Sequence, residues 1–172
     1  MKTPAKLLLE QGPMLKTLGR IAVKTAIPIG KTATENPKSF PVVCQVLESP
    51  SKELITHYSK WAGVTDSKYD KDLPPHMFTQ FALPICAKQI EMTRYNIGGI
   101  INQGCGMKIY DKIPRGQPLQ VTSKVINIEE NNGRARLHQR LDISAKSGTK
   151  AIEVDFYTAF IIGKGVKKKQ TE

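Results

Sequence analysis

The chain has 172 residues, of which 40% are hydrophobic and 24% are charged, values that are ordinary for one globular domain. Its formal net charge of +11 is unusual, and the excess lies at the two ends, since residues 1–40 hold seven Lys and Arg against two Glu and residues 164–172 hold four Lys against one Glu. No apolar run approaches the roughly 20 residues that span a bilayer, and the sequence predicts a basic N-terminal arm (1–40), one domain (41–163) and a basic C-terminal tail (164–172).

The three cysteines, Cys44, Cys86 and Cys105, are far apart and form no C-x-x-C pair. This spacing argues for reduced thiols rather than a disulfide framework or a zinc site. Leu7–Leu9 is too short for the core of a signal peptide, so the chain is expected to be cytoplasmic.

In the arm, residues 14–27 are predicted to form a short helix with leucines and Ile21 on one face. We expect this helix to pack on the domain, because its apolar face lacks Trp and Phe; contact with anionic lipid is the alternative. Residues 28–40, rich in Pro and Gly, are predicted to be a loop.

The domain begins with a predicted strand over 41–47, rich in β-branched residues. Ser49 is the expected N-cap of the next helix, with Pro50 at its first position, and Gly63 is expected to end that helix. Residues 64–75 are predicted to be a polar loop.

An extended Pro-Pro pair then leads into a helix predicted over 76–93. Its apolar residues recur at i, i+3, i+4, i+7 and i+8, which is typical of a buried helix. They are Phe78, Phe81, Ala82, Ile85 and Cys86.

Strands follow to the end of the domain. They are predicted at 97–111, 119–130, 134–144 and 150–162, with a hairpin turn at Asn131-Asn132-Gly133. In the third of these strands Ala135, Leu137, Leu141 and Ile143 share one face. This order of elements predicts an α+β fold, an antiparallel sheet with a buried helix.

Two segments resemble the MaoC-like acyl dehydratase/hydratase family of the hot-dog fold, in which a sheet wraps around a long central helix. LPPHMFTQFALPI (73–85) resembles the start of that helix, and INQGCGMKIYDKIPRGQPLQVTSKV (101–125) resembles the two strands that follow. The resemblance covers about 41–162. It implies an acyl-CoA or acyl-carrier-protein substrate, no cofactor, and pairing with a second hot-dog chain of the same or another kind.

Family hydratases use an Asp and a His from a D-x-N-P-x-H loop. Asp66 lies near the place of the Asp, but no Asn-Pro-x-His follows it, and Lys71 stands where the His belongs. The resemblance implies that Asp66 acts as the base that orients water, while His76 donates a proton or holds the water; alternatively, His76 only caps the helix entry. The backbone around Thr79 and Gln80 would supply the oxyanion N–H.

Gly104 and Gly106 are candidate substrate-binding positions because small residues let a substrate approach the strand; a β-bulge is the other interpretation, and the favoured one. Asp66, Asp70 and Asp72 lack the Gly and closing Glu of a calcium loop, so no metal is expected. His57 and His138 are expected to be exposed and inert.

Three functions remain open from the sequence. The first is an acyl-thioester hydratase or dehydratase with a modified active site, and the second is a non-catalytic acyl-thioester-binding or scaffold protein. The third is a membrane- or nucleic-acid-associated module driven by the basic ends. The basic tail lacks interleaved aromatic residues, so nucleic acid is the least favoured partner.

Overall fold

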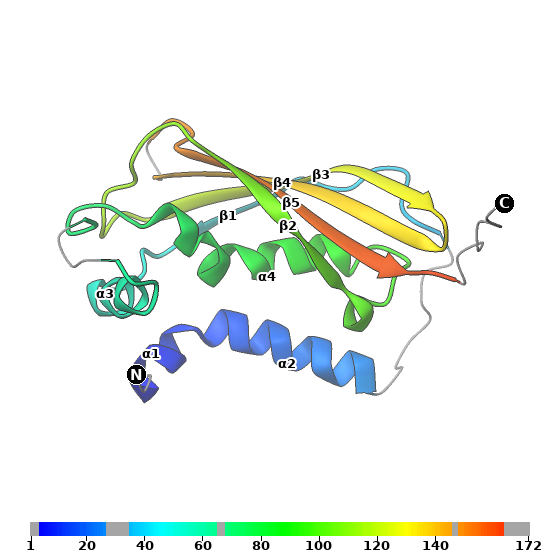
Figure 1. Ribbon diagram of the computed structural model, residues 1–172, viewed down its shortest axis with the longest axis horizontal. Coiled ribbons are helices and arrows are strands. Elements are labelled where there is room, and N and C mark those ends of the chain that lie inside the picture. The colour runs from blue at the N-terminus through cyan, green and yellow to red at the C-terminus, as the bar shows by residue number, and fades with distance from the viewer. Residues whose placement is uncertain (1–3, 27–34, 65–67, 146–147, 164–172) are drawn as a thin grey trace, which may run out of the picture.

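The computed structural model describes residues 4–26, 35–64, 68–145 and 148–163. A five-stranded antiparallel sheet with the order β1-β3-β4-β5-β2 lies over one central helix, α4 (Figure 1). The strands are β1 (Val43–Leu47), β2 (Ile101–Ile109), β3 (Leu119–Asn131), β4 (Arg134–Ala145) and β5 (Ile152–Ile161). The predicted antiparallel sheet packed on a central helix is confirmed.

Four α-helices accompany the sheet in the described part of the chain. They are α1 (Ala5–Glu10), α2 (Gly12–Ala26), α3 (Lys52–Trp61) and α4 (Thr79–Ile90), with short 3₁₀ helices η1 (Pro75–Phe78) and η2 (Ile97–Gly99). Helix α2 runs along the side of α4 that faces away from the sheet (Figure 1). The central helix is therefore shorter than the predicted 76–93, because its first turn is a 3₁₀ turn led by the Pro-Pro pair and its α-helical part ends at Ile90.

The apolar stripe of α4 faces the sheet, as predicted. Phe78, Ala82, Ile85 and Cys86 are each at most 3% exposed. Full burial of a large apolar side chain contributes about 1.5–3 kcal/mol, so these contacts hold the sheet on the helix. Phe81 is only half-buried and lines a cavity beside α4.

Helix α3 begins two residues later than predicted. Ser51 is its N-cap, since the Leu54 N–H donates to the Ser51 Oγ at 3.1 Å. The predicted cap, Ser49, instead accepts a hydrogen bond from the Gly116 N–H at 3.0 Å and so joins this loop to the turn before β3. At the other end Gly63 has a positive φ of 72°, as expected for a residue that follows a helix C-cap.

The hairpin between β3 and β4 confirms the predicted turn. Asn132 and Gly133 both have positive φ, 49° and 73°, the combination that a tight hairpin turn requires. Along β4 the burial alternates without a break, and the inward positions include Gln139 besides the predicted apolar residues.

The strand predicted at 97–111 begins only at Ile101. Its first part forms η2, where the Asn96 side chain accepts a hydrogen bond from the Gly98 N–H at 2.9 Å. The pairing of β2 with β5 then shifts between Asn102 and Gly104, which confirms the bulge interpretation of this Gly-rich stretch.

The N-terminal arm packs on the domain, as favoured from the sequence, but it holds two helices instead of one. Leu7 of α1 is 1% exposed and belongs to the main core, while Ile21 of α2 packs against a second cluster of buried residues around Tyr95 and Phe160. Most of the predicted loop 28–40 lies outside the described residues. Within the described ranges, no helix combines the length and apolar character needed to cross a membrane.

Candidate functional site at the start of helix α4

Backbone pairing with a distant turn fixes the entry to α4. The Leu73 N–H donates to the Ile113 carbonyl at 2.7 Å, and the Arg115 N–H donates to the Lys71 carbonyl at 2.9 Å. Asp72 forms an isolated antiparallel bridge with Pro114. The polar loop before α4 is therefore anchored to the turn that leads into β3, and this anchor sets the position of η1.

His76 lies in η1 between two tyrosine rings. The Tyr58 ring on α3 is 5.3 Å from the imidazole, and the Tyr69 ring meets it edge-on at 5.9 Å, both measured between ring centroids. The Tyr58 hydroxyl also donates to the His76 carbonyl at 3.1 Å. Burial, with a smaller effect from the Lys68 charge, lowers the pKa of His76 below its usual 6.5, so the imidazole is neutral at pH 7.

Thr79 and Tyr58 meet on the same side of α4. Burial raises the pKa of Tyr58, and a hydrogen bond with the Thr79 side chain opposes that rise. Phe78, the last residue of η1, is itself helical (φ −52°, ψ −32°), so η1 continues directly into α4 and Thr79 begins the α-helix.

A cavity of about 340 Å³ lies beside the first two turns of α4, between the N-terminal arm and the domain. Gln80, expected to bind substrate, is one of its polar lining residues. The side-chain Oε1 of Gln11, another lining residue, is buried and has no partner among the described residues. Most of the wall is apolar, formed by Pro13, Met14, Val46, Leu47, Pro50, Leu54, Phe81 and Pro84.

The expected site residues fall into separate groups. His76, Thr79 and Gln80 come together at the start of α4, whereas Asp66 lies outside the described residues. Gly104 and Gly106 pair with Tyr157 and Asp155 on the sheet face that points away from α4.

Sequence reasoning missed the part that two tyrosines play in this site. Tyr58 lies in the helix predicted after Ser49 and Tyr69 in the predicted polar loop, and neither was assigned a role from the sequence. Their contacts with His76 join residues 18 and 7 positions apart in three different segments, which no local pattern encodes. The usable signal was the density of aromatic residues within twenty positions of His76, which include Trp61.

No protein-family model matches this chain, and no curated protein matches it by sequence. Solved structures do match. The ChsH1–ChsH2 complex from Mycobacterium tuberculosis aligns with a TM-score of 0.54 at 9% identity, over 72% of this chain and 86% of that one. The (R)-hydratase of A. caviae involved in PHA biosynthesis aligns with a TM-score of 0.53 at 9% identity, over 71% and 96%.

HtdX from Mycobacterium tuberculosis gives a TM-score of 0.57 at 14% identity, over 69% of this chain and 50% of that one, so the match spans about half of HtdX. All three similarities are similarities of fold, since the identities are low. Together with the strand order and the wrapped central helix, they establish that this chain has the hot-dog fold expected from its sequence.

Proposed function

We propose that the chain binds acyl thioesters of coenzyme A or acyl-carrier protein at the start of α4, and that its reaction type is enoyl-thioester hydration or the reverse dehydration, with a modified active site. The observation that carries the proposal is the apolar cavity beside Gln80, next to the polar group formed by His76, Tyr58 and Thr79. The cavity offers an apolar wall for the acyl chain, and the neighbouring polar side chains offer groups for the thioester end. Structural similarity to an (R)-hydratase supports the same reaction class.

In hydration, the water oxygen forms a bond to C3 of the enoyl thioester while a proton is delivered to C2. Asp66 is assigned the base that orients the water, and His76 the partner that holds the water or donates the proton. Burial keeps His76 neutral at pH 7, and a neutral imidazole is a better water-holding partner than proton donor. The environment of His76 therefore favours the water-holding role, in which the proton that Asp66 takes from the water is the one delivered to C2.

A second candidate is a non-catalytic acyl-thioester-binding or scaffold protein. One observation favours it specifically, because the sequence after Asp66 lacks the Asn-Pro-x-His of the family loop.

One experiment separates the two candidates. Hydration of crotonyl-CoA is followed by the loss of enoyl absorbance, and binding of butyryl-CoA, its saturated analogue, is measured by calorimetry on the same protein. Binding with turnover supports the enzyme, and binding without turnover selects the non-catalytic candidate. Absence of binding by either method, with acyl-carrier-protein thioesters included, contradicts both.

Pairing through β2 is part of the proposal. This edge strand exposes nearly all of its residues, including Ile101 and Ile109 at 45% and 58%, and its outer backbone edge has no neighbouring strand among the described residues. An exposed apolar edge favours addition of a second sheet. The partner is a second copy or another hot-dog chain. Light scattering of the purified chain distinguishes these, since a mass of 19.1 kDa at micromolar concentration excludes the homodimer.

The proposal places the protein in the cytoplasm. Cys44 and Cys105 are exposed free thiols, which suits a reducing compartment.

A further inference from the structure

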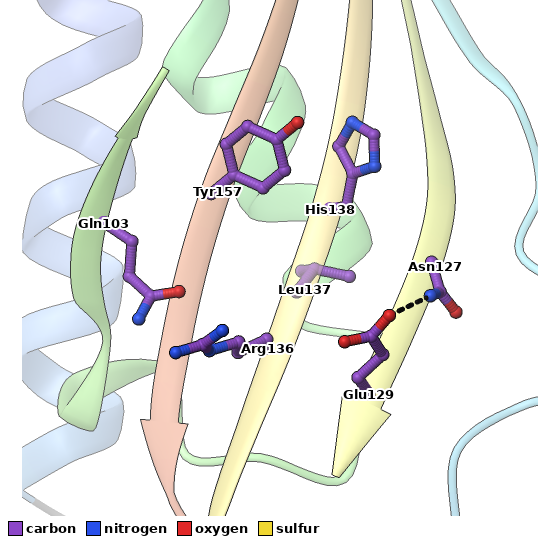
Figure 2. Close-up of a pocket in the computed structure, with 7 residues that line it drawn as sticks. All are labelled: Gln103, Asn127, Glu129, Arg136, Leu137, His138 and Tyr157. Atoms are coloured by element: carbon purple, nitrogen blue, oxygen red, sulfur yellow. Dashed lines mark hydrogen bonds between the residues drawn. The ribbon is translucent and has the colours of Figure 1, made fainter. Parts of the chain in front are cut away.

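A second hollow lies on the outer face of the sheet, on the side opposite α4. It has a volume of about 430 Å³ and crosses β2, β5, β4 and β3 (Figure 2). It is lined by Gln103, Asn127, Glu129, Arg136, Leu137, His138 and Tyr157. None of these residues belongs to the site at the start of α4.

Two β-bulges flank this hollow. Asn127, His138, Tyr157 and Gly104 form one row across the four strands. The register of β2 shifts just before Gly104, which leaves Gln103 unpaired, and the register of β3 shifts just before Asn127. Bulges re-aim side chains and are frequent next to functional sites. Here both edges of the hollow carry a lining residue that a bulge positions.

Gly104 keeps the β2 side of the hollow open. Its φ of +111° is one that side-chain-bearing residues rarely adopt, and no atom lies within 4 Å of the place where a Cβ would be. Glycine at position 104 can adopt the backbone conformation that the bulge requires, and its missing side chain leaves the adjoining part of the hollow open.

Contacts with neighbouring side chains hold His138 and Tyr157 in place on one side of the hollow. The Nε2 of His138 lies 2.7 Å from the Oδ1 of Asp155, whose two carboxylate oxygens accept hydrogen bonds from Arg140 at 2.9 and 3.2 Å. The imidazole also stacks on the Tyr157 ring, with 4.6 Å between centroids. The side chain of His138 is 21% exposed. The expectation that this histidine is exposed is therefore wrong, because the neighbouring strand supplies both an acceptor and a ring.

Across the hollow, the polar groups divide into two sides. Arg136 is directly opposite Glu129 in the register, yet Glu129 accepts instead from the Nδ2 of Asn127 at 2.9 Å. Figure 2 shows Arg136 extending toward Gln103, with Glu129 and Asn127 at the other side. Among the described residues, the side chains of Arg136 and Gln103 have no hydrogen-bond or ion-pair partner. One side therefore offers free donors and the other a carboxylate acceptor.

We propose that this hollow binds a phosphate ester that also carries hydroxyl groups, the chemistry shared by sugar phosphates and nucleotides. The guanidinium fork of Arg136 and the amide of Gln103 bind the phosphate oxygens. The ligand hydroxyls donate to Glu129, and the ring of the ligand packs beside the His138–Tyr157 pair. Glu129 repels a bare phosphate, so the hydroxyl groups are needed for affinity.

The test is calorimetry on the full chain with ribose 5-phosphate and AMP, and with inorganic phosphate and ribose for comparison. Arg136→Ala is expected to weaken binding of ribose 5-phosphate by about tenfold, the order of one charge-assisted contact. Arg134→Ala is the matched control, since Arg134 is exposed on the same strand, lies outside the hollow and carries the same charge. That control is expected to change binding by less than about twofold.

Glu129→Gln supplies a second, independent readout. The variant is expected to weaken binding of ribose 5-phosphate, because the acceptor of the ligand hydroxyls loses its charge. It is expected to strengthen binding of inorganic phosphate, because the repulsion between Glu129 and the phosphate is removed. AMP binding more tightly than ribose 5-phosphate indicates a nucleotide ligand, and equal binding indicates a sugar phosphate; either result supports the site. Equal losses in the two Arg variants, or no saturable binding of any phosphate ester, overturn the proposal.

Discussion

Gln139 of β4 donates from its Nε2 to the Oε1 of Gln89 of α4 at 2.9 Å, in the middle of the apolar contact between the sheet and the central helix. Both residues are 0% exposed. Gln89 also accepts from the Ser123 Oγ at 2.7 Å and donates to the carbonyls of Pro41 and Ser123. This one side chain therefore joins α4 to β4, to β3 and to the segment before β1.

Replacing the two glutamines by leucine is expected to have unequal effects. Gln89→Leu removes the acceptor of the buried Ser123 Oγ and one of the two acceptors of the Gln139 Nε2, whose other acceptor is the Cys86 carbonyl. The expected cost is about 1–3 kcal/mol of the free energy of unfolding. Gln139→Leu leaves Gln89 bonded to Ser123, and it also removes the Gln139 Oε1, which is buried without a partner among the described residues. Its expected cost is below about 1 kcal/mol.

Urea unfolding at neutral pH measures both effects. Gln117→Leu, at an exposed position before β3, is the matched control and should leave the unfolding midpoint nearly unchanged. Equal destabilisation by the two buried variants would show that Gln89 does not organise this contact.

The sequence predicted the sheet because apolar and polar residues alternate along some strands and clear turn residues bound the others. The Asn-Gly hairpin and the stripe of α4 follow from local rules of period and turn conformation. The sequence did not predict that Gln139 is buried. Its hydrogen-bond partner, Gln89, lies fifty residues earlier on a helix, and no local pattern in the strand indicates that contact. Only the packed tertiary structure pairs two such residues.

Local rules also misplaced features that depend on distant contacts. The sequence predicted Ser49 as the N-cap of α3, but Ser51 is the cap, and Glu10 of α1 holds it there because its carboxylate accepts from both the N–H and the Oγ of Ser51. Likewise, His138 was expected to be exposed because charged residues flank it on its strand, but Asp155 and Tyr157 of β5 contact it and reduce its exposure. Of the site at α4, the sequence predicted the part formed by the first residues of the central helix, namely His76, Thr79 and Gln80.

His76 is expected to make stability depend on pH. Because burial lowers the pKa of His76 in the folded chain, the unfolded chain binds the proton more readily below the usual value of 6.5. The free energy of unfolding should therefore fall as the pH drops from about 6.5 to the folded-state pKa. The carboxylates with lowered pKa, such as Glu130 and Asp155, ordinarily titrate at 4.5 and 3.8 and contribute only in more acidic solution.

Thermal unfolding measured between pH 7 and 5 checks this dependence. His76→Gln should flatten the plot of unfolding free energy against pH in that window, relative to the unmodified chain. Identical slopes for the two proteins would contradict the assignment.

The cysteines are expected to react in two classes. Burial raises the pKa of Cys86 to about 12, and the residue is 1% exposed, so its thiolate is scarce and inaccessible. Cys44 and Cys105 are exposed. Mass spectrometry after treatment with a thiol reagent at neutral pH should find the two exposed cysteines modified and Cys86 modified only in urea. Labelling of Cys86 at the rate of the others would mean that α4 opens readily from the sheet.

The cavity beneath the arm is expected to set the length of acyl chain that binds. Met14 lines this cavity from α2, so Met14→Phe should reduce its volume and weaken long-chain acyl-CoA more than short-chain acyl-CoA. Leu15→Phe is the matched control, because Leu15 neighbours Met14 on the same helix and is 48% exposed. Competition binding with a series of acyl chain lengths measures both, and equal effects of the two variants would place the acyl chain elsewhere.

If the chain hydrates crotonyl-CoA, the rate is expected to depend on Asp66 and His76. Loss of a positioned acid or base costs on the order of 10²–10⁴ in rate, so Asp66→Asn and His76→Ala should each lower kcat by that range. Asp70→Asn, a change of the same kind in the same loop, should have little effect. His76→Gln keeps a side chain able to hold water, and because the buried imidazole is neutral at pH 7, this variant should retain more activity than His76→Ala. Full activity in Asp66→Asn or His76→Ala would show that the proton-transfer groups lie elsewhere on the same fold.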